Sequence, residues 1–311
     1  MRYGVARAHA LAAVCCLGTL TACGSPPIAW QPPAERLSAS SAQPKGWMYD
    51  AQLYGNDASI FRRSGFSLNF LEQLTQFLSA PKGTKATPDG WWYVANSVFS
   101  NVLVYRSTPH GPRGPVQFLE DRDEIPSGVD MTPNRQLVVV ANSTTNAGGA
   151  GSVAVYLGRN THRSRLLRYG TALLTGFGVA LDPAQNCYFS FNQLGLVGGS
   201  IVEFPKCDGS GTLVVSGITS AGGLTFDGAG NLYYIDQASG IYKCSGTSRC
   251  VLFSTGYILP LNLNFDQHRE HLWVADGGGF IDAVDPASGK ILSHTLPLGG
   301  PPFAVAPSPG G

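Results

Sequence analysis

One segment recurs along this sequence at a nearly constant interval. Each copy combines a turn, a short aromatic or β-branched strand that ends in Asn or Asp, a second turn and a second strand; the clearest copy is FDGAGNLYYIDQASGIYKC, residues 226–244. The polar strand ends lie 46, 50, 44 and 40 residues apart, at Asn96, Asn142, Asn192, Asp236 and Asp276. A period this regular predicts one supersecondary unit per copy.

Each copy is predicted to contain four short antiparallel strands. A strand that contains glycine precedes most copies, as in SGVDMTP, FGVALDP and GGLTFDG, and a more variable strand follows, as in RCVLFSTG. Four strands in 40 to 50 residues are typical of a propeller blade, which cannot bury both of its faces alone. The 39 glycines, 21 prolines and only 13% charged residues agree with many strands joined by many turns. We therefore expect an all-β propeller.

The two ends of the chain supply complementary parts of one further blade. Residues 45–63, KGWMYDAQLYGNDASIFRR, contain an aromatic strand ending in Asp50 but have no Gly-led first strand. Residues 301–310, PPFAVAPSPG, are such a first strand with nothing after it. We expect residues 303–306 to pair beside residues 47–61, which closes a six-bladed ring over residues 47–311 and removes a long free edge.

The copies resemble NHL repeats, and the chain from residue 47 is similar to the six-bladed NHL and gluconolactonase-like (SMP-30-like) propellers. GGLTFDGAGNLYYID, residues 222–236, matches the repeat pattern best. Thr87 and Thr132 stand where the family often has Asp, and DQHREH, residues 266–271, replaces the usual D-x-x-G-N turn. The resemblance implies the fold strongly and an activity only weakly, because function belongs to sites carried on folds.

The N-terminus is a separate segment. Arg2 and Arg7 precede an apolar run that ends in small residues, which is typical of an export signal and too short to span a bilayer as a stable helix. Its end, LTAC, resembles the bacterial lipobox, so we expect residues 1–22 to be a signal peptide and Cys23 to carry lipid; the alternative is an ordinary secretory signal with an incidental cysteine. Residues 23–46, rich in Pro and Ser, are expected to be a tether. Gly24 after the cysteine favours, by resemblance, the outer membrane of the bacterial cell envelope.

Four cysteines lie in the expected propeller. Their even number in an exported chain favours pairing. Cys187 lies on the second strand of its copy and Cys207 just after the third, while Cys244 and Cys250 flank the turn between a third and a fourth strand. We expect the disulfides Cys187–Cys207 and Cys244–Cys250, with reduced thiols as the alternative.

The Asp and Asn strand ends are the candidate site residues. On one interpretation each accepts hydrogen bonds from backbone N–H groups of the turn that follows it. On the other, they gather at one rim of the central channel and offer oxygen ligands to a divalent cation such as calcium. The channel-rim candidates are Asp50, Asn96, Asn142, Asn192, Asp236 and Asp276. A metal pair formed by His268 and His271 is weighed against exposed turn residues, and the turn is preferred.

No nucleophile elbow, phosphate-binding loop or zinc-protease motif occurs in the sequence. The main hypothesis is therefore a lipid-anchored, non-enzymatic scaffold that binds a protein, glycan or small molecule. We expect it to be a monomer without a cofactor. Rim side chains such as Phe99, Phe177 and Tyr257 are its expected contacts. The alternative is a metal-dependent lactonase or related hydrolase. With 21 basic and 20 acidic residues and no basic run, nucleic acid is not an expected partner.

Overall fold

The computed structural model describes residues 46–170, 174–193, 198–296 and 300–309. Every described residue lies in one compact unit, Ala42–Gly311. The predicted signal peptide, Cys23 and the tether up to residue 45 lie outside the described residues. In the ranges given above, no helix is long and apolar enough to cross a membrane.

The described residues form six four-stranded antiparallel sheets, as expected. Blades 1 to 3 are β24 (Ala304–Ser308), β1 (Trp47–Gln52), β2 (Asp57–Ser64) and β3 (Ser67–Leu74); β4 (Pro81–Ala86), β5 (Trp91–Asn96), β6 (Asn101–Thr108) and β7 (Gly111–Glu120); and β8 (Glu124–Met131), β9 (Leu137–Thr145), β10 (Ser152–Leu157) and β11 (Arg165–Leu167). Blades 4 to 6 are β12 (Leu174–Leu181), β13 (Cys187–Gln193), β14 (Gly199–Phe204) and β15 (Thr212–Ile218); β16 (Ala221–Phe226), β17 (Leu232–Asp236), β18 (Gly240–Ser245) and β19 (Ser248–Ser254); and β20 (Pro260–Phe265), β21 (Leu272–Asp276), β22 (Phe280–Val284) and β23 (Ile291–Thr295). A 3₁₀ turn, η1 (Pro205–Cys207), follows β14.

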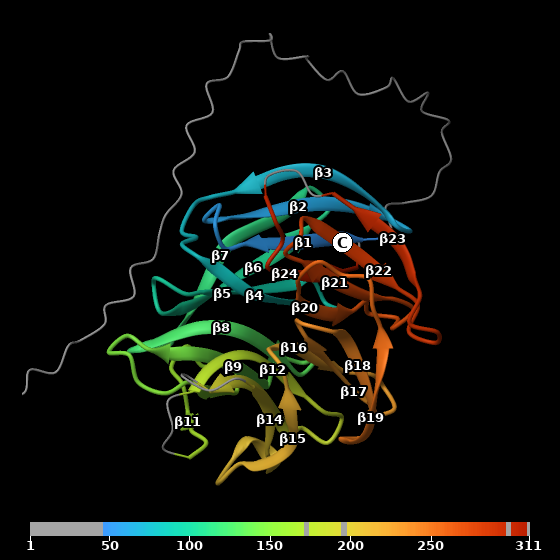
Figure 1. Ribbon diagram of the computed structural model, residues 1–311. Helices are drawn as coiled ribbons and strands as arrows, with labels where there is room; N and C mark the ends of the chain where they lie inside the picture. The colour runs from blue at the N-terminus through green and yellow to red at the C-terminus, as the bar shows by residue number, and fades with distance from the viewer. Residues whose placement is uncertain (1–45, 171–173, 194–197, 297–299, 310–311) are drawn as a thin grey trace, which may run out of the picture. The chain divides into compact units, whose positions relative to one another are not determined.

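The ring closes as predicted, because β24 from the C-terminal end pairs with β1 in blade 1. Val305 lies opposite Asp50, and Ala306 lies opposite Tyr49. Figure 1 shows the six sheets around one axis, with the first strand of each blade innermost. The prediction of an all-β, six-bladed propeller is confirmed.

Aromatic and β-branched side chains fill the spaces between blades. Tyr49 of blade 1 stacks on Trp92 of blade 2 with ring centroids 4.4 Å apart, and both rings are fully buried. Trp273 of blade 6 is likewise buried and packs in a cluster with Met48 and Phe61 of blade 1. Each blade therefore buries both faces only because it has a neighbour on each side.

Glycines allow the first strands to touch near the axis. A Cβ on Gly83 would lie 2.3 Å from Cα of Gly128, one on Gly128 would lie 3.2 Å from Cα of Gly178, and one on Gly178 would lie 3.0 Å from Cα of Gly223. Contacts this short exclude a side chain without movement of the neighbouring backbone. The Gly-led first strands of the sequence are thus explained by backbone packing around the channel.

Both expected disulfides are present. Cys187 on β13 joins Cys207 in η1, and Cys244 on β18 joins Cys250 on β19, its direct partner across the two strands. The paired cysteines are 20 and 6 residues apart in sequence. The first disulfide crosslinks blade 4, and the second joins the two outermost strands of blade 5.

Candidate functional site in the central channel

The two ends of the channel have different chemistry. We call the face that carries the connections between blades the crossover face, and the face that carries the turns between first and second strands the turn face. Most first strands have a β-bulge near the crossover face, with a register shift at residues such as Ser127, Phe177 and Leu261. A bulge redirects the side chain of its extra residue. These bulges occur where side chains can reach the channel.

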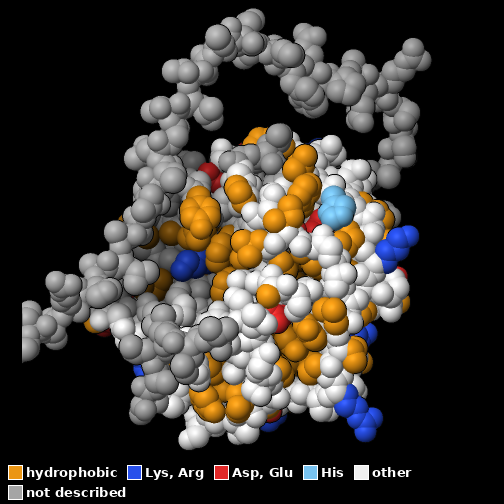
Figure 2. Space-filling model, in the orientation of Figure 1, with side chains coloured by type: hydrophobic (Ala, Val, Ile, Leu, Met, Phe, Trp, Pro, Cys, Tyr) orange, Lys and Arg blue, Asp and Glu red, His pale blue; other side chains and the backbone are white. Residues whose placement is uncertain are grey.

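Two phenylalanines meet across the channel near the crossover face. Phe177 comes from blade 4 and Phe303 from the segment before β24 of blade 1, and these blades lie opposite each other in a six-membered ring. Their rings stack with centroids 5.6 Å apart and planes 20° apart. Phe177, predicted as a rim contact, therefore spans the channel. In the face shown in Figure 2, hydrophobic side chains cover much of the surface.

At the turn face the channel opens into a cavity of about 600 Å³. Its walls come from the ends of the first strands and the turns that follow them; they include Met131, Leu181, Phe226, Phe265 and Arg269. We call this cavity the turn-face chamber. Its size suits a small organic molecule. Its walls combine apolar residues with many polar and charged ones, among them Asp182, Asp227 and Gln267.

An ion pair forms the most polar part of this chamber. Lys85 Nζ lies 3.1 Å from Asp130 Oδ1 and donates to Asn264 Oδ1 at 2.9 Å. The other oxygen of Asp130 accepts from the backbone N–H of Leu181 at 2.8 Å, and Asn264 donates to the carbonyl of Val305 at 2.7 Å. Blades 1, 2, 3, 4 and 6 thus hold the ion pair in place. The ammonium has three hydrogens, so one remains for a ligand in the chamber.

Lys85 and Asp130 were missed by the sequence reasoning, although a signal existed. Each lies two residues after the glycine of its first strand, Gly83 or Gly128, at a position that sister strands fill with Ala180, Thr225 or Asn264. The two first strands are adjacent, and both residues lie on the same side of the bulge. An ion pair between this lysine and this aspartate could therefore have been predicted from the sequence.

The predicted Asp and Asn series lies on the crossover face, away from this chamber. Asp236 accepts backbone N–H groups of Thr219 and Ser220 at 3.1 Å each, and Asp276 accepts those of Ile258 and Leu259. Burial by itself would raise the pKa of Asp236, but backbone hydrogen bonds from Thr219 and others outweigh it, and the pKa lies below its usual value. Each side chain fastens the segment that enters its own blade.

The asparagines follow the same pattern in part. Asn96 Oδ1 accepts from the N–H of Ser79 at 2.7 Å, and Asn192 Oδ1 accepts from the N–H of Ala221 at 2.8 Å. Asn142 instead donates to Ser152 Oγ at 3.1 Å. Asn96 and Asn192 therefore bond backbone N–H groups, whereas Asn142 bonds a side chain of its own blade.

The first member of the series is shifted by two residues. Gln52, not Asp50, ends β1 and pairs with the first residue of β2, as Asn96 pairs with Asn101 in blade 2. Asp50 corresponds to Val94 of β5, two residues before the strand end, and is fully buried. Its position within the blade, rather than at the rim, sets it apart from the other five.

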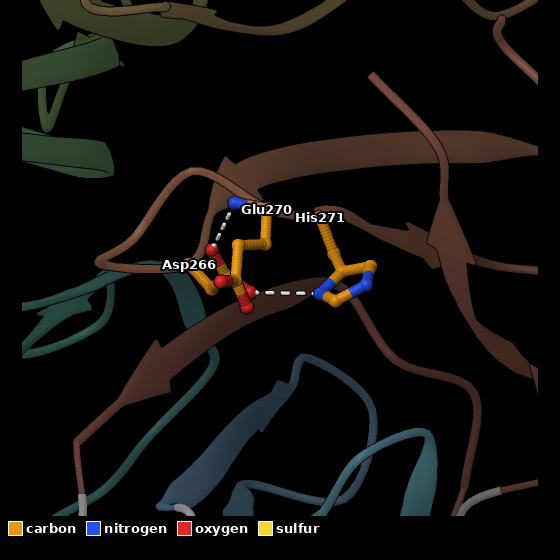
Figure 3. A group of neighbouring side chains, drawn as sticks. All are labelled: Asp266, Glu270 and His271. Atoms are coloured by element: carbon orange, nitrogen blue, oxygen red, sulfur yellow. Dashed lines mark hydrogen bonds and ion pairs between the residues drawn. The ribbon is translucent and has the colours of Figure 1, made fainter. Parts of the chain in front are cut away.

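One group of described residues has the ligand types of a metal site: Asp266, Glu270 and His271 in the turn after β20. Asp266 Oδ1 accepts from the N–H of Glu270 at 2.8 Å, and Oδ2 lies 3.0 Å from His271 Nδ1 (Figure 3). Oδ2 also lies 3.8 Å from an Arg63 nitrogen.

The sister turn of blade 5 shows what this arrangement does. Asp227 accepts from both the backbone N–H and the side-chain amide of Asn231, at 2.8 Å each. In blade 6, His271 takes the place of the amide, so the group is a turn clamp of the same design. Because the carboxylate of Asp266 is already bonded to the turn and lies beside Arg63, these residues do not fit a catalytic metal ion. His268 is exposed on the same turn and is absent from the group.

The other predicted rim residues are also placed. Phe99 is exposed in the turn between β5 and β6, and Tyr257 bonds Ser254 through its hydroxyl group at 2.7 Å. Neither contacts the turn-face chamber.

No protein-family model and no curated protein matches the chain. Solved structures do: a luciferin-regenerating enzyme (15% identity, TM-score 0.52, 70% of this chain and 76% of that one) and the calcium-binding protein regucalcin from Agrobacterium tumefaciens (14%, 0.55, 73% and 77%). A protein of unknown function from Bacteroides thetaiotaomicron is also similar (16%, 0.56, 73% and 64%). At these identities the comparison establishes the fold.

The comparison also corrects the main functional hypothesis. The expected non-enzymatic scaffold is contradicted, because one of these structural neighbours is named as an enzyme. The alternative, a metal-dependent lactonase or related hydrolase, is the better supported of the two hypotheses.

Proposed function

We propose that the chain is a lactonase-like hydrolase that binds a small ester or cyclic ester in the turn-face chamber. The observation that carries the proposal is the Lys85 ammonium, held by Asp130 and Asn264 with one hydrogen left for a ligand at a cavity of about 600 Å³. Similarity to a solved propeller that is named as an enzyme supports an enzymatic function.

The proposed roles follow from charge. When water attacks an ester carbonyl, negative charge develops on the carbonyl oxygen, and a fixed donor stabilises it more than it stabilises the substrate. Lys85 would donate to that oxygen. Asp130 would act as a positioning residue, because it holds Lys85 and is itself fixed by the backbone of Leu181. Phe226 and Phe265 would contact the apolar part of the substrate.

The proposal needs no step through a metal ion, since Asp266, Glu270 and His271 are engaged as a turn clamp. Removal of one such electrostatic donor typically lowers kcat by 10²- to 10³-fold. We therefore expect Lys85→Met to lose hydrolysis to that extent, whereas the exposed control Lys290→Met retains it.

The test uses the full chain purified in detergent, with a panel of five- and six-membered lactones and simple esters, with and without EDTA. Hydrolysis that survives EDTA and is lost in Lys85→Met supports the proposal. Hydrolysis that EDTA abolishes and divalent metal restores would overturn the metal-free mechanism, and failure to cleave any member of the panel would overturn the reaction class.

We also propose that Cys23 is lipidated and holds the enzyme on the outer membrane of a bacterial envelope, with residues 24–46 as the tether. The sequence LTAC and the two disulfides, which are typical of exported proteins, support this. Mass spectrometry of the mature N-terminus tests it. A diacylglyceryl group on Cys23 is expected, and an unmodified chain that begins at another residue would contradict it.

A further inference from the structure

Blade 1 carries two carboxylates, Asp50 and Asp57, at positions that are uncharged in its sister blades. Asp50 and Gln52 alternate with apolar residues on β1, and Asp57 lies opposite Gln52 on β2, so all three side chains share one face of the hairpin. At the position of Asp50, two residues before the strand end, the other blades carry Val94, Val140, Ser190, Tyr234 and Val274. None of these is charged.

Each of the three side chains is oriented by at least one hydrogen bond and keeps one oxygen without a partner. Gln52 Nε2 donates to Asp50 Oδ2 at 2.9 Å and to Ser59 Oγ at 3.1 Å, and Gln73 Nε2 donates to Asp57 Oδ2 at 2.6 Å. The remaining atoms, Asp50 Oδ1, Gln52 Oε1 and Asp57 Oδ1, are buried and have no hydrogen-bond partner. The two acceptors that flank Gln52 Nε2 also fix which end of its amide is the oxygen.

This cluster is buried, and no ion pair of the described residues compensates its charge. The exposed fractions of Asp50, Gln52 and Asp57 are 0%, 1% and 4%. Among the ion pairs of the described residues, none involves either carboxylate. Burial raises the pKa of Asp50 well above its usual value, and the nearby charge of Asp57 raises it further. An uncompensated pair of buried carboxylates costs several kcal/mol.

Two glycines lie close to the oxygens of this cluster. A Cβ on Gly55 would lie 2.3 Å from Asp57 Oδ2, and one on Gly300 would lie 3.2 Å from Gln52 Oε1. In blade 6 the two residues before the first strand, Ile258 and Leu259, donate their N–H groups to the strand-end carboxylate. In blade 1 the two residues before β24 are Pro302, which has no N–H group, and Phe303, whose N–H donates to the carbonyl of Ala51 at 2.8 Å.

Apolar side chains of the neighbouring blade pack on the same face of β1. Met48, on the same face of β1 as Asp50, packs in one cluster with Ala275 and Ile281 of blade 6. The cluster therefore faces apolar side chains across the junction of blades 1 and 6.

We propose that Asp50, Gln52 and Asp57 bind a calcium ion at this junction. Two carboxylates and an amide present three oxygens and a charge of −2, which matches a divalent cation that prefers oxygen ligands. Calcium accepts irregular sets of six to eight oxygens, with water or backbone carbonyls completing the set, whereas magnesium gives up its own water reluctantly. The site is separate from the turn-face chamber and independent of the proposed hydrolase activity.

Its role is to hold the closing strand. β24 pairs with β1, and Gln52 lies beside Gly300, which leads into β24. A bound ion at the β1–β2 hairpin would tie the two ends of the chain in one blade. Because the unfolded chain has no such site, binding stabilises the folded ring.

Two measurements on the full chain test the proposal. Calorimetric titration with calcium gives the stoichiometry and Kd of binding, and thermal unfolding is compared in EGTA and in CaCl₂. One ion per chain is expected, and at free calcium 100-fold above its Kd the ratio of folded to unfolded protein should rise on the order of 100-fold. Asp50→Asn should abolish binding and yet unfold at a higher temperature than the wild type in EGTA, because it removes a buried charge. The exposed control Asp123→Asn should behave as the wild type.

Three results would overturn the proposal: equal unfolding temperatures in calcium and EGTA with no heat of binding, calcium binding that Asp50→Asn leaves intact, or magnesium that stabilises as much as calcium. The first result would mean that water alone satisfies the three oxygens. An Asp57→Asn variant repeats the test from the other strand, so that a local defect of one variant does not decide it.

Discussion

Replacement of Gly83 by alanine tests whether backbone contact between first strands holds the ring together. The new Cβ would lie 2.3 Å from Cα of Gly128, 2.7 Å from the carbonyl oxygen of Ser127 and 3.0 Å from the carbonyl carbon of Gly128. All three atoms are backbone, so β4 and β8 must separate. Overpacking in a core costs about 1 to 3 kcal/mol, and a displaced strand belongs at or above the top of that range.

The matched control is Gly158→Ala. Gly158 has φ +63° and no atom within 4 Å of its ideal Cβ, so its cost is only the strain of a left-handed backbone, about 1 to 2 kcal/mol. In a domain of this size 1 kcal/mol shifts Tm by about 2 to 4 °C. We expect Gly83→Ala to lower Tm by roughly 6 to 12 °C or more in a calorimetric scan, and clearly more than the control. A Gly83→Ala protein that unfolds within about 2 °C of the wild type would refute the packing argument.

Three further outcomes are expected. Cys207→Ser should lower the free energy of unfolding by about 2 to 3 kcal/mol in urea titrations, and an unchanged midpoint would contradict it. Burial raises the pKa of Asp121 from 3.8 to about 6 and outweighs the opposing hydrogen bond from Arg163. The folded state therefore loses stability as pH rises between these two values, by up to about 3 kcal/mol. Asp121→Asn should remove this loss when the free energy of unfolding is measured from pH 4 to 7. A double-mutant cycle of Phe177→Ala and Phe303→Ala should give a coupling of about 1 kcal/mol, and additive effects would mean that the stack across the channel contributes nothing.

The fold was predictable because its determinants repeat. Strand ends such as Asn96 and Asp236 recur at a nearly fixed spacing, and the Gly-led strands mark where backbones meet. The closing blade followed from two incomplete copies at the chain ends. The disulfide Cys244–Cys250 followed from its place on either side of one hairpin turn.

The candidate sites were less predictable because they depend on register. A shift of two residues separates Gln52, at the strand end, from Asp50, inside the blade, and only the pairing with β2 distinguishes them. Lys85 and Asp130 come from different blades, and their contact depends on how two bulged strands twist around the axis. The spacing of the repeat along the sequence fixes neither the register of β1 on β2 nor the contact between Lys85 and Asp130.

Blade 1 differs from the other five in how it must form, and this accounts for its polar cluster. Its first strand, β24, lies at the opposite end of the chain from β1, so the pairing of Ala304 with Ala51 waits until the rest of the ring is in place. Contacts at such long sequence separation carry a large loop-closure cost before they stabilise anything. Sister blades meet no such cost and place an apolar residue, such as Val94 or Val274, where blade 1 has Asp50. A carboxylate at that position weakens the blade unless a cation binds there, so the ring would close firmly only where calcium is abundant, as it is outside the cytoplasm.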